Sequence, residues 1–199
     1  MNRWWSSEGA LTFSLVVDAA NLSLALNRWP QIALVTGLAV CESLHALYPA
    51  GSFGLKWPND VYLNGRKLCG ILVEAPSHRG RVVIGVGINV NNSFVSAPAE
   101  LRETATSLSD ASNDIFDLSD VLIAVIQRMG ARLSQLGSAF GFSDEFSRYC
   151  LLTGRNVQIQ LGREAFVGHC SGIDRDGALC IATSQGPQRL HSGSVISWD

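Results

Sequence analysis

The sequence predicts an α+β protein, in which a larger domain of strands and helices is followed by a small β-barrel. Three observations support this class. Short apolar runs of strand length recur in the first ninety residues, a long helical stripe covers residues 29–48, and short alternating runs separated by glycines follow residue 154. The chain of 199 residues, 47% of them hydrophobic, suffices for one core domain and a small appendage.

The first half alternates strands with one long helix. Residues 11–17 form an apolar run that predicts a strand. Pro30 suits the first turn of the helix over 29–48, because its missing N–H costs nothing there. Asn64-Gly65 is a strong hairpin signal, since a two-residue type I′ turn needs positive φ at both positions. Four further strands are predicted at 53–57, 61–63, 67–74 and 81–89.

The second half begins with a predicted surface excursion over residues 91–114, rich in Ser, Ala, Asn and Asp. Asp117 can cap a helix that runs to about residue 136, and Ser143 can cap a shorter one. Five short strands and an Asp176-Gly177 hairpin then predict the barrel. We therefore expect a catalytic-type domain over residues 1–152 and a small domain over 153–199.

Composition excludes several classes of protein. A net charge of −2 gives no electrostatic case for nucleic-acid binding. No run approaches the roughly 18 apolar residues that cross a membrane. The five cysteines lack close spacing, which is typical of reduced thiols in a cytoplasmic protein, and the four histidines show no metal-ligand spacing.

Residues 55–74 carry the candidate chemistry. Lys67 is either a solvated edge lysine or a cation directed at a carboxylate or phosphate. Asn59-Asp60 is either an ordinary turn or the place of a carboxylate that accepts a proton or orients an amine. Gly70, inside a strand pattern, marks either a bulge or the close approach of a ligand to the backbone.

Two other features bear on a nucleotide. Gly85-x-Gly87 lacks the third glycine of a dinucleotide fingerprint, and the chain has no Gly-Lys-Ser/Thr phosphate loop, so a nucleotide site here is of neither standard type. Trp4 either packs in the core or stacks on a base.

Together these motifs resemble the biotin–protein ligases. The resemblance rests on Lys-Trp-Pro-Asn-Asp at 56–60, Gly-Arg-Lys-Leu-x-Gly-Ile-Leu-x-Glu at 65–74 and Gly-x-Gly-Ile-Asn at 85–89. Segments at 105–108 and 172–179 are similar to two more of that family's segments. The resemblance covers essentially the whole chain, and it favours the functional reading of both Lys67 and Asp60.

The resemblance implies a fold and a two-step reaction. The fold would be a mixed β-sheet with helices on one side, followed by an SH3-like barrel. The biotin carboxylate would attack the α-phosphate of ATP, with Mg²⁺ assisting, to give biotinyl-5′-adenylate and pyrophosphate. A lysine of a biotin carrier domain would then displace AMP. Ligases of this kind can form homodimers, and the sequence leaves that state open.

The resemblance also implies roles for particular residues. Lys67 would contact the biotin carboxyl group and the adenylate phosphate, and Asp60 would orient or deprotonate the carrier lysine. The biotin pocket would be lined by Gly70, Leu72 and Gly85. The nucleotide would be bound by Trp4, Lys56, Asn59 and Asn89.

Two alternatives remain. Lipoate ligases and octanoyl transferases share the fold class but not these motifs in this form. The second alternative is a non-catalytic module that binds the carrier or the adenylate. It arises because the family's Gly/Arg-rich loop belongs upstream of residues 2–5, and a chain without that loop would not ligate efficiently. The place of the loop before Met1 leads us to expect that the natural sequence continues upstream.

Overall fold

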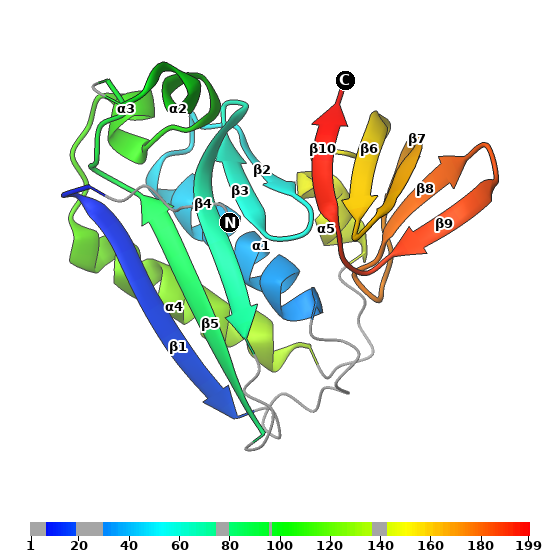
Figure 1. Ribbon diagram of the computed structural model, residues 1–199. Helices are drawn as coiled ribbons and strands as arrows, with labels where there is room; N and C mark the ends of the chain where they lie inside the picture. Colours follow the sequence, from blue (N-terminus) through cyan, green and yellow to red (C-terminus); the bar gives the residue numbers. More distant parts are fainter. Residues whose placement is uncertain (1–6, 19–29, 75–79, 96, 137–142) are drawn as a thin grey trace.

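The computed structural model describes residues 7–18, 30–74, 80–95, 97–136 and 143–199. These ranges form two five-stranded sheets and five helices, which confirms the α+β class (Figure 1). The first sheet has the order β1-β5-β4-β3-β2. Its strands are β1 (Ala10–Asp18), β2 (Phe53–Lys56), β3 (Asp60–Leu63), β4 (Arg66–Glu74) and β5 (Arg81–Asn89).

The prediction of a mixed sheet needs correction. Each pair of neighbouring strands among the described residues of this sheet is antiparallel. Parallel pairing is confined to two isolated bridges, Leu55 with Cys150 and Lys67 with Ala105. The physical reason lies in the connections: β2 to β5 follow one another through short links, whereas parallel neighbours need long crossovers.

Two helices cover one face of this sheet, and no helix of the described residues covers the other, which is called the open face below (Figure 1). They are α1 (Pro30–Leu47) and α4 (Leu118–Ser134). A Cβ at Gly37 of α1 would lie 2.6 Å from Leu55 Cδ2, so glycine there allows the helix to pack directly on β2. Asp117 caps α4 as predicted, because its side chain accepts hydrogen bonds from the N–H groups of Ser119 and Asp120.

The predicted surface excursion contains two short helices that the sequence reading missed, α2 (Ala99–Thr104) and α3 (Leu108–Ser112). Ser107 caps α3 by accepting a hydrogen bond from the N–H of Asp110. Residue 143 is the first residue of α5 (Ser143–Tyr149), and the cap predicted there stays a prediction.

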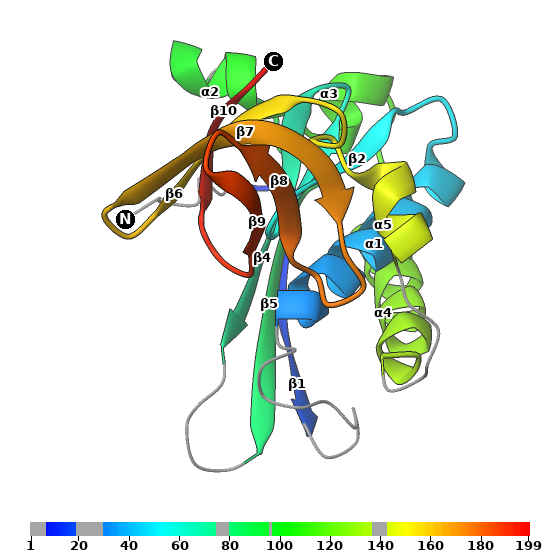
Figure 2. The same ribbon diagram turned by 90° about the vertical axis from the view of Figure 1, so that its right-hand side faces the viewer.

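The second sheet has the order β10-β6-β7-β8-β9 and curls strongly on itself (Figure 2). Residues 143–199 are described throughout, and no strand pairing in that range joins β9 to β10. A closed barrel is therefore not confirmed, and the described strands form a curled sheet without that closing ladder. Its strands are β6 (Asn156–Leu161), β7 (Glu164–Ile173), β8 (Leu179–Thr183), β9 (Gly186–Leu190) and β10 (Ser194–Trp198).

Among the described residues, two side-chain hydrogen bonds join the larger part of the chain to the turn between β7 and β8. The indole N–H of Trp57, which is buried at the end of β2, donates to the carbonyl oxygen of Gly177 at 3.2 Å. The side-chain amide of Gln31 in α1 donates to the carbonyl oxygen of Arg175 at 2.9 Å. Both acceptors belong to the β7–β8 turn, so this turn is one point where the second sheet is attached. None of the described helices is both long and apolar enough to cross a bilayer.

Candidate active site

One row of paired residues crosses all five strands of the first sheet. Thr12 pairs with Gly87, Gly87 with Gly70, Gly70 with Asp60, and Asp60 with Lys56. Residues directly opposite in antiparallel strands project on the same face. The row therefore places a carboxylate and an ammonium at one end, a hydroxyl at the other, and bare backbone between them.

A second row runs beside the first and widens this floor. Ser14 pairs with Gly85, and Gly85 pairs with Leu72, whose side chain is 59% exposed. A Cβ at Gly85 would meet the Leu72 carbonyl oxygen at 3.6 Å, an ordinary contact, so the strand itself does not require glycine there. The glycine keeps the space above the sheet empty, which suits a flat ligand lying on the backbone.

A β-bulge brings Lys67 to the same face. Val61 pairs with Cys69, but the next residue, Tyr62, pairs with Lys67, so Leu68 is an extra residue in β4. Strict alternation would put residues 67 and 70 on opposite faces, and the extra residue removes that conflict. Lys67 Nζ lies 2.6 Å from Asp60 Oδ1. The irregularity is thus at Leu68, whereas Gly70 is regularly paired, which favours the ligand-approach reading of Gly70.

The turn at residues 57–59 fixes the position of Asp60. Asn59 Nδ2 donates to the carbonyl oxygen of Ile71 at 2.7 Å, and the Ile71 N–H donates back to the Asn59 carbonyl oxygen at 3.0 Å. This reciprocal pair holds the turn against β4 beside Gly70. Because the Asn59 amide group is used inside the protein, its contribution to a site includes orienting the neighbouring carboxylate.

Lys56 is held between two aromatic rings. Its Nζ lies 4.5 Å from the centroid of the Trp198 ring and 5.7 Å from that of Tyr62. Burial lowers the pKa of the Lys56 ammonium; the nearby Asp60 carboxylate opposes this shift and the Lys67 charge adds to it. Burial also raises the pKa of the Tyr62 hydroxyl to about 12, and Asp60 acts in the same direction.

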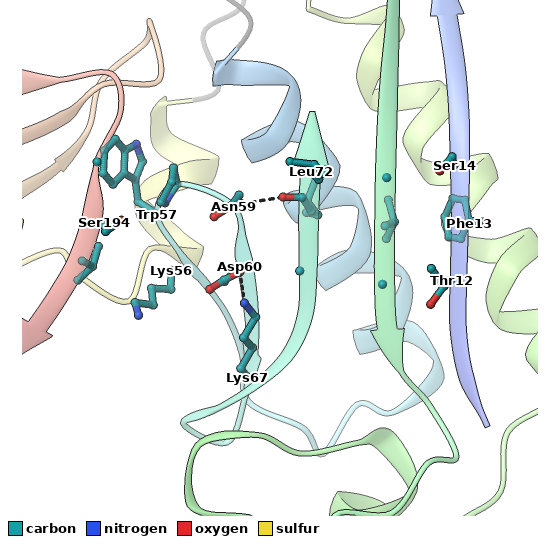
Figure 3. Close-up of a pocket in the computed structure, with 18 residues that line it drawn as sticks. Thr12, Phe13, Ser14, Lys56, Trp57, Asn59, Asp60, Lys67, Leu72 and Ser194 are labelled. Carbon is teal, nitrogen blue, oxygen red and sulfur yellow. Dashed lines mark hydrogen bonds and ion pairs between the residues drawn. The ribbon is translucent and has the colours of Figure 1, made fainter. Parts of the chain in front are cut away.

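These groups surround a cavity of about 690 Å³ on the open face of the sheet (Figure 3). Gly193, Ser194 and Val195, at the start of β10 and just before it, form a wall from the second sheet. A cavity of this size is within the range of small-molecule and cofactor sites.

The cavity brings together most of the predicted site residues. Its lining includes Lys56, Asn59, Asp60, Lys67, Gly70, Leu72 and Gly85. Asn89 shares the face of Gly85 and Gly87 by strand alternation, but it is buried and accepts a hydrogen bond from Asn92 at 3.1 Å, and it does not line the cavity. Trp4 lies outside the described residues.

The sequence reading missed the two flanks of the cavity. Thr12, Phe13 and Ser14 of β1 line one side, and residues 193–195 line the other. A signal for the first existed, since Thr12 and Ser14 are polar residues at alternate positions of an apolar strand. The sequence holds no local signal for residues 193–195, because only the docking of the second sheet brings them to the site.

The described residues form no cluster of three or more His, Cys, Asp or Glu side chains that could hold a metal ion. Among the described residues that line the cavity, Asp60 is the only carboxylate. This part of the chain therefore builds no metal site of its own.

Two parts of the chain match models of known protein families. Residues 1–91 match the family model described as the biotin/lipoate A/B protein ligase family. Residues 152–198 match the model described as the biotin protein ligase C-terminal domain.

Named relatives and a solved structure agree with these matches. The bifunctional ligase/repressor BirA of Bacillus spizizenii is 32% identical over 200 residues, covering 96% of this chain and 60% of that protein. The biotin–[acetyl-CoA-carboxylase] ligase of Mycobacterium tuberculosis is 31% identical over 198 residues, covering 98% of this chain and 72% of that protein. The biotin protein ligase from Aquifex aeolicus, in complex with biotin and ATP, superposes with a TM-score of 0.85 at 30% identity and covers 100% of this chain and 82% of that one.

The chain thus spans about three-fifths of the length of the first of these relatives. The motifs, the glycine-floored cavity with its charged end, and the match over nearly the whole chain point to one conclusion. This chain belongs to the biotin protein ligase family.

Proposed function

We propose that this protein ligates biotin to a lysine of a biotin carrier protein in an ATP-dependent reaction through biotinyl-5′-adenylate. The observation that carries the proposal is the row from Thr12 to Lys56. It offers a flat backbone floor for a ring system and places the paired charges of Lys67 and Asp60 at one end. Such a floor suits biotin, and such an end suits its carboxylate beside a phosphate.

The first step would use Lys67. The biotin carboxylate oxygen attacks the α-phosphorus, a new P–O bond forms, and the bond to pyrophosphate breaks. Negative charge gathers on the transferring phosphoryl group, and a positioned ammonium stabilises it more in the transition state than in the ground state. Lys67 would contact both the acid and the phosphate, with Gly70, Leu72 and Gly85 forming the biotin pocket.

The second step would use Asp60. The amine of the carrier lysine attacks the acyl carbon, the bond to the phosphate oxygen breaks, and AMP leaves. Asp60 would orient the amine and accept its proton, a role that the reciprocal hydrogen bonds of Asn59 and Ile71 support by fixing the turn before it. Lys56 and Asn59 line the nucleotide side of the cavity in this assignment, and Asn89 and Trp4 keep their proposed nucleotide roles.

The remaining assignments are also predictions. We propose a catalytic domain over residues 1–152 and a small domain over 153–199. Mg²⁺ would accompany ATP; because the described residues build no metal site, it would be held mainly by phosphate oxygens, and no step above depends on it. A carboxylase carrier subunit as acceptor, a cytoplasmic location, the absence of nucleic-acid binding and association into a homodimer stay predictions.

The test is biotin-dependent exchange of labelled pyrophosphate into ATP. We expect exchange with biotin and none with lipoate or octanoate. A second assay follows the mass of a biotin carrier domain, with its acceptor Lys→Arg variant as the control. Exchange with lipoate or octanoate would replace biotin by one of those acids, and carrier binding without exchange would make the chain a non-catalytic module.

A further inference from the structure

Lys56 is the cation of the cavity that has no carboxylate partner at ion-pair distance in the described part of the chain. Asp60, which pairs with Lys56 across β2 and β3 through the backbone, forms its ion pair with Lys67 instead. In Figure 3 the Lys56 side chain points away from that pair and toward β10. Its ammonium contacts are the rings of Trp198 and Tyr62.

This arrangement leaves the described cavity with a net positive charge. Its ionisable lining residues of defined charge are Lys56, Lys67 and Asp60. Lys67 and Asp60 lie in contact and largely cancel each other, so the net charge is that of Lys56. An aromatic ring attracts an ammonium through its quadrupole without neutralising it, unlike a carboxylate. A lysine held by rings therefore stays available to an arriving anion.

We propose that Trp198, together with Tyr62, is a positioning residue that holds the Lys56 ammonium at the cavity as an unneutralised cation for the polyphosphate of ATP. The proposal rests on the function proposed above and deepens it. It gives the second sheet a part in nucleotide affinity, because Trp198 lies on β10 whereas Tyr62 lies on β3.

The two rings are themselves arranged as a unit. Their centroids are 6.1 Å apart at an interplanar angle of 80°, an edge-to-face contact between the two sheets. Tyr62 is buried, and by strand alternation it lies on the same face of the sheet as Asp60. The edge-to-face contact therefore places the Trp198 ring beside Lys56 on that face.

The experiment measures binding of α,β-methylene ATP in the presence of biotin by titration calorimetry. The methylene bridge blocks the proposed chemistry, so affinity is read without turnover. We expect Trp198→Leu to weaken binding about fivefold to tenfold, the size of one cation–π contact. Trp198→Phe, which keeps a ring, should have an affinity between those of the wild-type protein and Trp198→Leu. Ile196→Ala, a change at an exposed apolar side chain of the same strand, is the matched control and should bind normally.

A double-mutant cycle separates positioning from packing. In a Lys56→Met background, Trp198→Leu should weaken analogue binding no further, because the residue it acts through is gone. An equal loss in both backgrounds, or equal effects of Trp198→Phe and Trp198→Leu, would overturn the proposal. Independently, the ring current of Trp198 should shift the ε-methylene protons of Lys56 upfield in NMR spectra, and Trp198→Leu should remove that shift. An unshifted wild-type signal would also overturn it.

The pyrophosphate exchange assay distinguishes this inference from the proposed function. If biotin-dependent exchange occurs and the effects of Lys56→Met and Trp198→Leu on analogue binding are additive, the ligase function is supported and the role of Trp198 is overturned. A coupled cycle without exchange would support the role of Trp198 and overturn the ligase function.

Discussion

At the scale of single residues, the proposed chemistry of the cavity depends on one close pair. The Lys67 ammonium and the Asp60 carboxylate are 2.6 Å apart, and both side chains are partly exposed to the cavity, at 34% and 19%. The β-bulge at Leu68 positions Lys67, and the hydrogen-bonded turn at residues 57–59 positions Asp60. In the proposed function each partner would exchange the other for a ligand group, so the two residues would have separable roles.

For Lys67, we expect Lys67→Met to lower biotin-dependent pyrophosphate exchange by about 100-fold or more. The reason is that removing one charge-stabilising donor in comparable sites costs about 2.7–4 kcal/mol. Circular dichroism should show an unchanged fold, since methionine keeps the length of the side chain. Exchange at the wild-type rate would show that another group carries the charge.

For Asp60, we expect Asp60→Asn to reduce transfer to the carrier domain more than it reduces adenylate formation. Loss of a positioned proton acceptor costs about 100-fold or more in a step that needs one. Single-turnover transfer from preformed adenylate, compared with pyrophosphate exchange, measures the two steps separately. Equal losses in both steps would place Asp60 in adenylation as well.

At the scale of elements, the strands determine what fits the cavity. The floor is made by Gly70, Gly85 and Gly87, which lie in the central strands β4 and β5. Backbone there is accessible only because no side chain covers it. The outer strands then contribute polar groups, with Thr12 and Ser14 on one side and Asp60 on the other.

The floor can be tested at Gly85. We expect Gly85→Val to raise the KM for biotin by about tenfold or more, because the new side chain occupies the space of the ring, while the strand accepts a Cβ without a close contact. Val83→Ala is the control, since Val83 lies on the same strand and does not line the cavity. A normal KM for biotin in Gly85→Val would place the ring elsewhere.

Helix α4 has a pH-dependent cap. The N–H groups of Ser119 and Asp120 hold the pKa of the Asp117 carboxyl below its usual value. A lowered folded-state pKa stabilises the protein above the unfolded pKa of about 3.9, and this stabilisation is lost as pH falls through the folded value. Asp117→Ala should therefore lower Tm at pH 7 and have a smaller effect near pH 2. Asp114→Ala, in the preceding loop, is the control; a Tm difference that does not depend on pH would contradict this role.

Sequence patterns predicted the elements better than the irregularities within them. The turn at Asn64-Gly65 has the two positive φ values that its residues indicated, and α1 and α4 lie within about two residues of their predicted ranges. Helix α3 had a usable signal that went unread, since Ser107 precedes Asp110 at capping distance. The bulge at Leu68 had none, because it arises from pairing between two strands and no local residue type requires it.

The candidate site shows the same contrast between features set by local sequence and features set by tertiary contacts. Most of its charged and glycine residues lie in three short motifs, at 56–60, 65–74 and 85–89, so they were found from the sequence. The positions of Asn89 and of residues 193–195 depend on burial and on docking of the second sheet, which a local pattern does not encode.

At the scale of the whole molecule, the two sheets are joined where the cavity is built. Trp57 connects them through its hydrogen bond to Gly177, and its ring is buried. We expect Trp57→Phe to lower the free energy of unfolding by about 2–4 kcal/mol, since it leaves a buried carbonyl unpaired and a small void. Urea unfolding followed by circular dichroism measures this. An unchanged free energy of unfolding would mean that the contact adds nothing to stability.

The wall at residues 193–195 has a consequence for the nascent chain during its synthesis. During translation, the segment with Lys67 and Asp60 leaves the ribosome long before β10, and synthesis proceeds at about 5–20 residues per second. For several seconds the nascent polypeptide carries its reactive charges on an unfinished surface. The pocket is completed only when one of its last strands arrives, so a partly made chain lacks the wall that would shield a labile intermediate from water.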